Sequence, residues 1–361
     1  MRPPADAAGT VVHFPGITTA PPLRADGDPA AEPDSQQIPQ IREIQVNDPR
    51  HVPVARERVL DLLEPVLTTS SDKEPVMVDA TTGLGGHTAA VLERFGDARV
   101  VGLDRDPHAV AAARQNLERF GERVSVHHAR YDQMDEVLDE LGIDGVDAVL
   151  FDLGVSSMQI DEAERGFAYS KSAPLDMRMD TTSDLTAEEV VNTYSQSELA
   201  RVLWQYGQER FARRIARAIV AERPLHTSDE LVAVVDAAVP AANRRKGHPA
   251  KRTFQAIRIE VNAELQSLAA ALPQALHRLR PGGRLVALSY HSLEDKMVKQ
   301  ALKAGAEESA PPDMPVLPAD SRPWLRLITR GSEVASEEEV AANPRARSVR
   351  LRAAEKLREA S

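Results

Sequence analysis

The fold of this chain is decided by residues 76–95, VMVDATTGLGGHTAAVLERF. An apolar run at 76–80 contains Asp79, a glycine-rich turn follows at 82–87, and 88–95 has the apolar spacing of a helix. Glycine lets the backbone approach a ligand closely, and the next helix offers free N–H groups at its N-terminus. The stretch therefore predicts a strand, a ligand-binding turn and a helix, although a tight turn without a ligand fits the same residues.

The alternation of strand and helix continues after this stretch. Short apolar runs predict strands, and helical apolar spacing predicts the helices between them: strands at 99–103, 124–128 and 146–153, helices at 107–120 and 134–141. The last of these strands is almost wholly apolar, as expected of a parallel strand that is buried on both faces. The pattern indicates the α/β class with a doubly wound parallel sheet.

The alternation stops after the fourth strand. Helical spacing then follows at 185–224, 226–239 and 253–279. Strand character returns later, with a fifth strand, a helix and a closing pair of strands at 284–289, 293–304, 325–329 and 348–353. We therefore expect a helical insertion within a sheet domain.

This pattern predicts that the chain has three parts. Residues 1–45 carry eight prolines within the first 40 positions and show no apolar period, which predicts a disordered tail. The sheet domain is expected to comprise residues 46–160 and 270–361, and the helical insertion domain residues 161–269.

The composition excludes several kinds of chemistry. The 361 residues carry a formal net charge of −11 and contain no cysteine, which excludes disulfides, Cys-ligated zinc, iron–sulfur clusters and thiol nucleophiles. There is no HExxH pattern and no close group of His and carboxylate residues in the sequence, so we expect no metal. No apolar run approaches the ~18 residues of a membrane span. The N-terminus lacks the layout of a secretory signal, so we expect a cytoplasmic protein with no membrane partner.

Polar residues at two strand ends indicate a nucleoside site. Asp104 ends the second strand, where a carboxylate typically accepts hydrogen bonds from a ribose diol. A dinucleotide fingerprint starting at Gly83 requires glycine at position 88, where Thr88 stands, so NAD is disfavoured. The turn looks more like that of a nucleoside-binding methyltransferase. Next to it, His87 either contacts a carboxylate or caps the helix.

Asp152 follows the fourth strand, which we expect beside the first. A buried carboxylate needs partners, so Asp152 either binds substrate or caps the next turn. Two loop aromatics, Phe167 and Tyr169, are candidates for stacking on a base, or else they pack between domains. Within 174–180, Arg178 either contacts substrate or pairs with its acidic neighbours. After the fifth strand, His291 is a candidate for orienting substrate, and we expect the following residue, Ser292, to cap the helix.

The helical insertion is basic although the whole chain is acidic. Residues 210–258 contain eleven Lys and Arg against four acidic residues, a local excess of +7. Clustered cations of this kind contact phosphates. We expect RNA contact at 243–252, which includes Lys251 and Arg252. For 210–217, a solvated helix face is the simpler interpretation.

These segments make the chain resemble a known family, the bacterial ribosomal RNA small subunit methyltransferase H family. The resemblance covers residues 51–357 and rests on nine motifs: HVPV (51–54), DATTGLGGHT (79–88), GLDRDP (102–107), FDLGVSS (151–157), ERGFAYS (164–170), PLDMRMD (174–180), KRTFQAIRIEVN (251–262), SYHSLEDK (289–296) and NPRARS (343–348).

The resemblance implies a class I methyltransferase fold, a Rossmann-like seven-stranded sheet, with a helical insertion. It implies S-adenosyl-L-methionine as cofactor and methyl transfer to N4 of a cytidine in the decoding region of 16S ribosomal RNA. It also implies this RNA, within the small ribosomal subunit, as partner. Carried over by motif, the cofactor contacts are Gly85, Gly86, His87, Asp104, Tyr131, Asp152 and Gln159.

Asp152 is the candidate catalytic residue. The lone pair of the cytosine amine is delocalised into the ring, and accepting hydrogen bonds from the amine, by Asp152 and a carbonyl at 153–154, localises it. Related amino-methyltransferases have Asp/Asn-Pro-Pro-aromatic where this chain has DLGV at 152–155, so Phe167, Tyr169 or Tyr290 is expected to stack on the base. The predicted substrate or RNA contacts are Phe167, Tyr169, Arg178, Lys251, Arg252 and His291.

The absence of cysteine also bears on the target atom. Methylation at C5 of a pyrimidine normally needs a thiolate to activate the ring, and this chain has none. A heteroatom target is therefore expected, which agrees with an exocyclic amine and leaves a ribose oxygen open. A NAD-dependent oxidoreductase and a non-catalytic RNA-binding or assembly factor are the alternative functions.

Overall fold

A single mixed sheet organises the molecule. The computed structural model describes residues 52–68, 74–241, 249–308 and 321–359. The predicted tail at 1–45 and most of the basic stretch 243–252 lie outside these residues. The strands lie in the order β3-β2-β1-β4-β5-β7-β6. Their bounds are β1 Val76–Asp79, β2 Arg99–Asp104, β3 Val124–His128, β4 Val146–Asp152, β5 Leu279–Ser289, β6 Leu325–Leu327 and β7 Arg350–Lys356.

The first five strands are parallel, and β7 runs antiparallel to both of its neighbours, β5 and β6. The alternation of strand and helix predicted this parallel core. The predicted fifth strand began at 284, whereas β5 starts at Leu279. The carboxyl ends of β1, β2 and β4 meet at one edge of the sheet, which is where open α/β sheets bind ligands.

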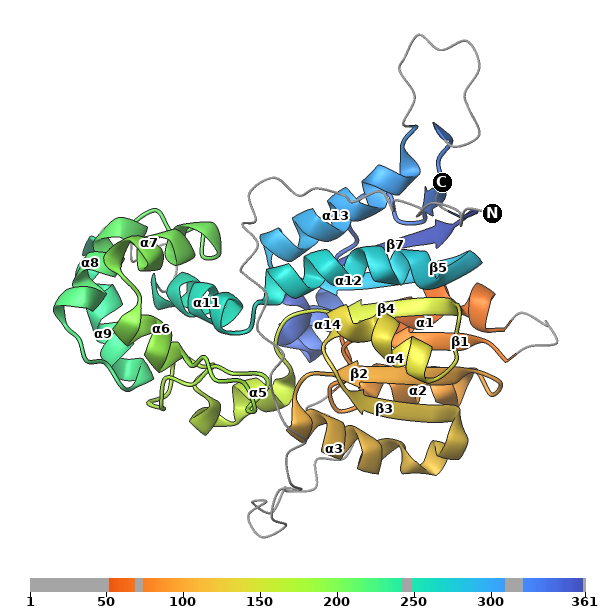
Figure 1. Cartoon of the computed structure of the whole chain (residues 1–361), viewed down its shortest axis with the longest axis horizontal. Coiled ribbons are helices and arrows are strands. Elements are labelled where there is room, and N and C mark those ends of the chain that lie inside the picture. Colours follow the sequence, from red (N-terminus) through yellow and green to blue (C-terminus); the bar gives the residue numbers. More distant parts are fainter. Residues whose placement is uncertain (1–51, 69–73, 242–248, 309–320, 360–361) are drawn as a thin grey trace, which may run out of the picture.

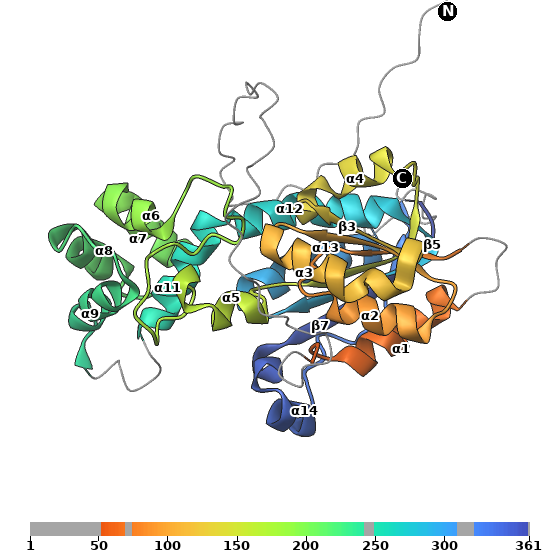
Figure 2. The same ribbon diagram turned by 90° about the horizontal axis from the view of Figure 1, so that it is seen from below.

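Helices cover both faces of the sheet. Successive residues of a strand point to opposite faces, so Met77 of β1 packs with α1 and α2 while its neighbour Val78 packs with α4, α12 and α13. Figure 2 shows α4 and α12 on one side of the strands and α1 and α2 on the other. The bounds are α1 Arg56–Leu67, α2 Gly86–Arg94, α3 Pro107–Leu117, α4 Met134–Glu140, α12 Glu264–Arg278 and α13 Ser292–Ala306.

The remaining helices include a separate bundle between β4 and β5. Figure 1 shows α6, α7, α8, α9 and α11 gathered beside the sheet domain. The bounds are α5 Ser157–Asp161, α6 Ala187–Thr193, α7 Gln196–Gln205, α8 Ala212–Ala221, α9 Ser228–Ala238, α11 Pro249–Val261 and α14 Glu337–Ala342. The helical insertion was therefore predicted correctly, although the stretch 185–224 contains three helices.

The predicted helix at 253–279 is two helices. The chain breaks at Ala263, whose φ of 47° is left-handed, and α12 then packs against the sheet domain through α4 and β5. We propose that the insertion ends at Ala263 and not at 269/270, because a boundary at 269/270 falls inside α12. In the described part of the chain, none of the helices combines the length and apolar character needed to cross a bilayer.

Candidate functional site

A cavity of about 450 Å³ lies at the carboxyl ends of β1, β2 and β4, between the sheet and the helical bundle. Eight of the predicted site residues line it: Gly86, His87, Asp104, Tyr131, Asp152, Gln159, Lys251 and His291. The others that were predicted do not line it: Gly85, Phe167, Tyr169, Arg178 and Arg252. Its size is within the range of small-molecule and cofactor sites.

The glycine turn forms one wall of this cavity. Gly83, with a φ of 54°, donates its backbone N–H to Asp104 Oδ2 over 2.7 Å. Gly85 is the residue before α2, and its φ of 87° suits glycine. A Cβ on Gly85 would lie 2.9 Å from Leu117 of α3. The α-carbon of Gly85 therefore packs against another helix, and the cofactor contact at Gly85 stays a prediction.

Asp104 directs a carboxylate at the cavity. Its Oδ2 accepts from Gly83, and its Oδ1 accepts from the Asp106 backbone N–H over 2.8 Å. Burial raises the pKa of Asp104 to about 6. Asp79, by contrast, is fully buried below the turn and accepts from Thr88 Oγ1 over 2.7 Å. Asp79 therefore ties the helix start to β1, and Asp104 is the acidic group available to a ligand.

Three side chains converge on Asp152. Tyr290 donates its hydroxyl to Asp152 Oδ1 over 2.7 Å, and His87 Nε2 lies 3.5 Å from Oδ2. The backbone N–H of Asp152 donates to Thr81 Oγ1. Burial, together with the Asp152 charge, raises the pKa of Tyr290 well above its ordinary value, so its phenol stays a donor. Of the two predicted roles for His87, the structure shows the contact with a carboxylate.

Tyr131, in the short 3-10 helix after β3, and Gln159 of α5 line the cavity. The Tyr131 hydroxyl donates to the Glu264 carbonyl over 3.0 Å, which holds its ring at the cavity wall. The Gln159 side chain donates to Asp106 Oδ2 over 3.0 Å and accepts from the Ser156 backbone. Its amide is thus committed to fixing α5, and it shapes the cavity by position.

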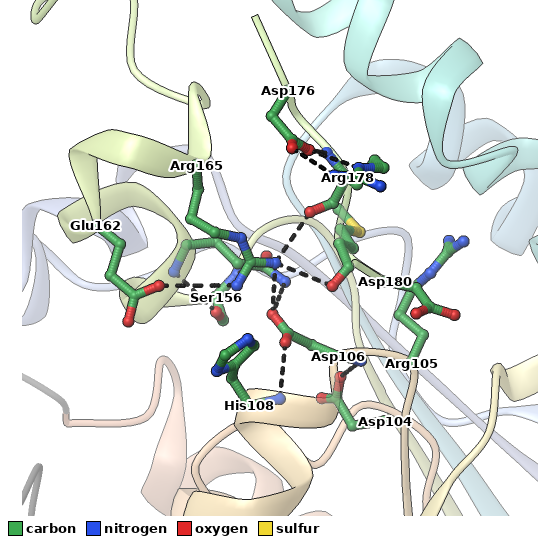
Figure 3. A network of polar contacts seen from close by, with 12 residues as sticks. Asp104, Arg105, Asp106, His108, Ser156, Glu162, Arg165, Asp176, Arg178 and Asp180 are labelled. Carbon is green, nitrogen blue, oxygen red and sulfur yellow. Dashed lines mark hydrogen bonds and ion pairs between the residues drawn. The ribbon is translucent and has the colours of Figure 1, made fainter. Parts of the chain in front are cut away.

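Figure 3 shows the network that holds the loop after α5 against the sheet domain. Arg165 donates to Asp106 Oδ2 over 2.9 Å and to two carbonyls of the loop. Arg178 forms two hydrogen bonds to the carboxylate of Asp176 and donates to two further carbonyls. Arg178 was predicted to contact substrate, but its donors are used within its own loop, so the internal ion-pair alternative holds.

The loop aromatics lie away from the cavity. Tyr169 packs edge-on against Phe254 of α11 with ring centres 6.1 Å apart. Phe167 lies under the Arg165 guanidinium and packs against the core. Neither ring lines the cavity, whereas Tyr290, the third candidate for stacking on the base, does.

The two basic residues near the start of α11 point in different directions. Lys251 lines the cavity, as a substrate contact requires. Arg252 points elsewhere and lies 3.9 Å from the carboxylate of Glu209. Neighbouring residues on a helix point about 100° apart, so only one of them faces the cavity.

His291 caps α13 and also lines the cavity. Its Nδ1 accepts from the Glu294 backbone N–H, and the Glu294 carboxylate accepts from the backbone N–H of Tyr290 and His291. Ser292, which was predicted as the cap, donates to Gln208 instead. That prediction was wrong because histidine is not a usual capping residue.

The fold brings Glu264, His291 and Glu294 within 4.8 Å of one another, although the sequence showed no such group. Arg258 binds the Glu264 carboxylate through two contacts of 2.8 Å. Because His291 Nδ1 accepts, its proton lies on Nε2, which faces Glu294 Oε1 at 3.1 Å. Burial raises the pKa of Glu294, but His291 and Arg258 outweigh it and lower the pKa overall. Arg258 thus supplies this cluster with a cation from within the protein.

Two segments far apart in the sequence, 52–54 and 343–345, supply cavity residues that the sequence analysis did not predict. Residues 52–54 line the cavity from one side, and Asn343 and Arg345 line it from another. Asn343 donates its side-chain amide to the Val52 carbonyl over 3.0 Å, and Arg345 pairs with Asp161 of α5. The motifs HVPV and NPRARS were visible in the sequence, but their residue types carry no distinctive chemistry.

The sheet order with antiparallel β7, and a cavity bounded by the glycine turn and Asp104, define a class I S-adenosyl-L-methionine-dependent methyltransferase. The chain belongs to the MraW methylase family, whose sequence model matches residues 48–357. Family membership excludes the oxidoreductase alternative.

Two sequence relatives support the same assignment. The chain is 56% identical to the ribosomal RNA small subunit methyltransferase H of a Nocardioides species, over 86% of this chain and 98% of the relative. It is 58% identical to the protein of that name from Frankia alni, over 85% of this chain and 95% of the relative. Among solved structures, an rRNA methylase from Streptococcus thermophilus matches at 13% identity with a TM-score of 0.38, over 83% of this chain and 95% of that one.

The cavity fits the cofactor of this class. Asp104 presents a carboxylate where ribose hydroxyls need an acceptor, and Tyr131 offers a ring beside it. His87 Nε2 is buried, lies 3.5 Å from Asp152 Oδ2 and makes no hydrogen bond among the described residues, so it is available to a polar group of a ligand. The α2 N-terminus adds its positive dipole end.

Proposed function

We propose that this protein methylates the exocyclic N4 of a cytidine in the decoding region of 16S ribosomal RNA, within the small ribosomal subunit in the cytoplasm. The observation that carries this proposal is the position of Asp152. One oxygen is held by Tyr290, and the other faces the cavity beside His87. Relatives named ribosomal RNA small subunit methyltransferase H, which span 86% of the chain, support it.

Asp152 is the group that makes the amine reactive. Bound S-adenosyl-L-methionine supplies an activated methyl group. Asp152 Oδ2 accepts one N4 hydrogen, and a carbonyl at Leu153 or Gly154, both cavity residues, accepts the other. These bonds localise the nitrogen lone pair toward the methyl group. Holding the reactants in line contributes about 7–11 kcal/mol to lowering the barrier.

The reaction also releases a proton. As the N–C bond forms and the methyl–sulfur bond breaks, the amine carries one proton too many. Asp152 Oδ2 is in position to take it, because Tyr290 occupies only the other oxygen. The cavity opens between the sheet and the bundle, so the target base has to leave its stack to enter it.

The remaining cavity residues lie on two sides of the cavity. Gly86, His87, Asp104 and Tyr131 lie on the side formed by β1, β2 and the loop after β3, which suits the cofactor. Lys251 of α11 and His291 after β5 lie on the side of the helical bundle, which suits the target nucleotide.

The test is mass mapping of methylated nucleosides in 16S ribosomal RNA from cells with and without the protein. We expect loss of N4-methylated cytidine without it, rescue by the wild type and no rescue by Asp152→Asn. Titration calorimetry should show that Asp152→Asn still binds S-adenosyl-L-methionine. Normal methylation by this variant would contradict the role of Asp152, and an unchanged methylation pattern without the protein would contradict the proposed function.

A further inference from the structure

Helix α8 presents arginines whose donors make no bond to the described residues. Arg213, Arg214 and Arg217 are exposed, and Arg210 precedes the helix by two residues. Residues three and four apart share a helix face, so Arg213, Arg214 and Arg217 form one arginine face, and Arg210 lies in the turn before it. None of them forms a hydrogen bond or ion pair with the part of the chain that the structure describes.

Other arginines of the helical bundle and its border are paired. Arg201 pairs with Glu260 at 3.1 Å, and Arg258 with Glu264 at 2.8 Å. Arg223 donates to the Val191 carbonyl over 2.7 Å. Like charges three and four residues apart on a helix repel each other. The arginine face therefore costs stability in the free protein, and a polyanion would compensate it.

The surroundings of this face suit a nucleic acid backbone. Arg214 and Arg217 border a hollow of about 620 Å³ between α8 and α9. One acidic residue, Glu222, also lines the hollow, and the rest of its lining is small and apolar: Ala218, Ala221, Ala233, Val234, Ala237 and Ala238. Trp204, at the end of the neighbouring helix α7, is 64% exposed. Exposed aromatic side chains and cations on one surface are typical of single-stranded nucleic acid binding.

The arginine face is distinct from the cavity. Figures 1 and 2 both place α8 on the side of the bundle that is turned away from the sheet. None of its arginines lines the cavity. A ligand at this face would therefore be bound at a second place, remote from the reacting base.

We propose that the arginine face of α8 binds phosphates of the substrate RNA outside the cavity and anchors it during methyl transfer. This inference rests on the proposed function for the identity of the RNA. An acidic protein surface would also attract arginines, but the small-walled hollow and the exposed indole favour RNA.

The test compares two variants of the full chain. The first is Arg213→Gln with Arg214→Gln and Arg217→Gln. The control, Lys299→Gln with Lys303→Gln and Arg330→Gln, removes the same charge from exposed positions outside the bundle. Binding to a 16S ribosomal RNA transcript is measured at several salt concentrations, with KM for the RNA, cofactor binding and the unfolding temperature.

For the arginine variant, the slope of log affinity against log salt should become shallower by about 2–3, because each lost phosphate contact removes about one unit. KM for the RNA should rise about tenfold or more, with cofactor binding and unfolding temperature unchanged. The control should keep the wild-type slope.

An unchanged slope in the arginine variant, or an equal change in both variants, would overturn the inference. Weaker binding to assembled subunits with an unchanged slope on free RNA would identify a protein contact instead and would also overturn it. If the wild type binds RNA with the expected slope but does not methylate it, the proposed function fails and the phosphate contact stands.

Discussion

Tyr290 decides which oxygen of Asp152 is available to substrate. Its hydroxyl donates to Oδ1 over 2.7 Å, and its raised pKa keeps it protonated. Gly154 makes room for the ring, since a Cβ there would lie 3.3 Å from it. Without this bond the carboxylate is free to rotate, so its free oxygen no longer has a fixed direction.

We predict that Tyr290→Phe slows methyl transfer tenfold to a hundredfold. A hydrogen bond to a charged group contributes about 1.5–3 kcal/mol, and about 1.4 kcal/mol is a factor of ten. The measurement is single-turnover transfer at saturating RNA, with cofactor affinity by calorimetry as the control. A wild-type rate in this variant would show that Asp152 is held by other contacts.

Asp104 gives cofactor binding a pH dependence. Burial raises its pKa to about 6, so the free protein presents a carboxylate above that pH and a protonated acid below it. Only the carboxylate can accept from both ribose hydroxyls. We predict that affinity for S-adenosyl-L-methionine is constant above about pH 6 and falls below it. Calorimetry from pH 5 to 8 measures this, and Asp104→Asn should bind weakly at every pH without the inflection.

The same group affects stability with the opposite sign. A carboxyl whose pKa is raised on folding favours the folded state at low pH. Its contribution declines as the pH rises from about 4, where the unfolded chain loses the proton, through about 6. A fall in affinity below pH 6 therefore cannot be attributed to destabilisation by Asp104.

Site residues at strand ends could be predicted from the sequence, and those in the long loop could not. Asp104 and Asp152 each follow a strand, so the sheet alone brings them to one edge. The path of the loop that carries Phe167 and Arg178 depends on long-range bonds such as that from Arg165 to Asp106. Local sequence contains no signal for such a bond.

At the scale of elements, one arginine joins the loop after α5 to the first turn of α3. The Asp106 side chain is fully buried and caps α3 by accepting from the His108 backbone over 3.0 Å. Arg165, 11% exposed, is its cationic partner. Gln159 of α5 shares the same carboxylate oxygen and lines the cavity.

We predict that Arg165→Met lowers the free energy of unfolding by about 3 kcal/mol, because it leaves a buried carboxylate without its cation. Cofactor affinity should also fall, since Gln159 loses its fixed partner. Urea unfolding measures the first effect and calorimetry the second. The matched control is Arg130→Met, which breaks an exposed pair with Asp132 and should cost less than about 1 kcal/mol. Equal losses in the two variants would contradict this account.

The break between α11 and α12 shows a limit of apolar periodicity. The helical pattern continues across 253–279, but Ala263 takes a left-handed conformation. Asn262 donates to the Met177 carbonyl and accepts from the Met179 backbone, and Arg105 donates to the Asn262 carbonyl. These tertiary hydrogen bonds hold the chain in its break at Ala263. Because they involve residues distant in the sequence, the apolar spacing of 253–279 does not predict the break.

At the scale of the whole molecule, the parallel core could be predicted and the sheet edge could not. Alternating strands and helices imply parallel neighbours. The place of β7 depends on pairing between 350–355 and 284–289, two segments far apart in the sequence. The contact between Asn343 and the Val52 carbonyl at the cavity could not be predicted for the same reason, because these residues are also far apart in the sequence.

The segment before α1, residues 52–55, forms part of the cavity wall and its support. Pro53 lies against the glycine turn, since a Cβ on Gly86 would be 2.7 Å from its ring. Val54 is buried among α1 and α2. The Ala55 backbone N–H donates to Glu339 of α14. Two truncations that differ by eight residues should therefore behave differently.

We predict that a chain starting at residue 48, where the family match begins, keeps wild-type cofactor affinity. A chain starting at Arg56 should bind S-adenosyl-L-methionine at least about tenfold more weakly, because residues 52–54 line the cavity and their apolar contacts with the cofactor are lost. Calorimetry measures both, and the full-length Pro53→Ala variant separates loss of the cavity wall from loss of α1 packing. If the chain starting at Arg56 bound as tightly as the longer one, residues 52–55 would have no part in the site, and the cavity would be complete without the N-terminal segment.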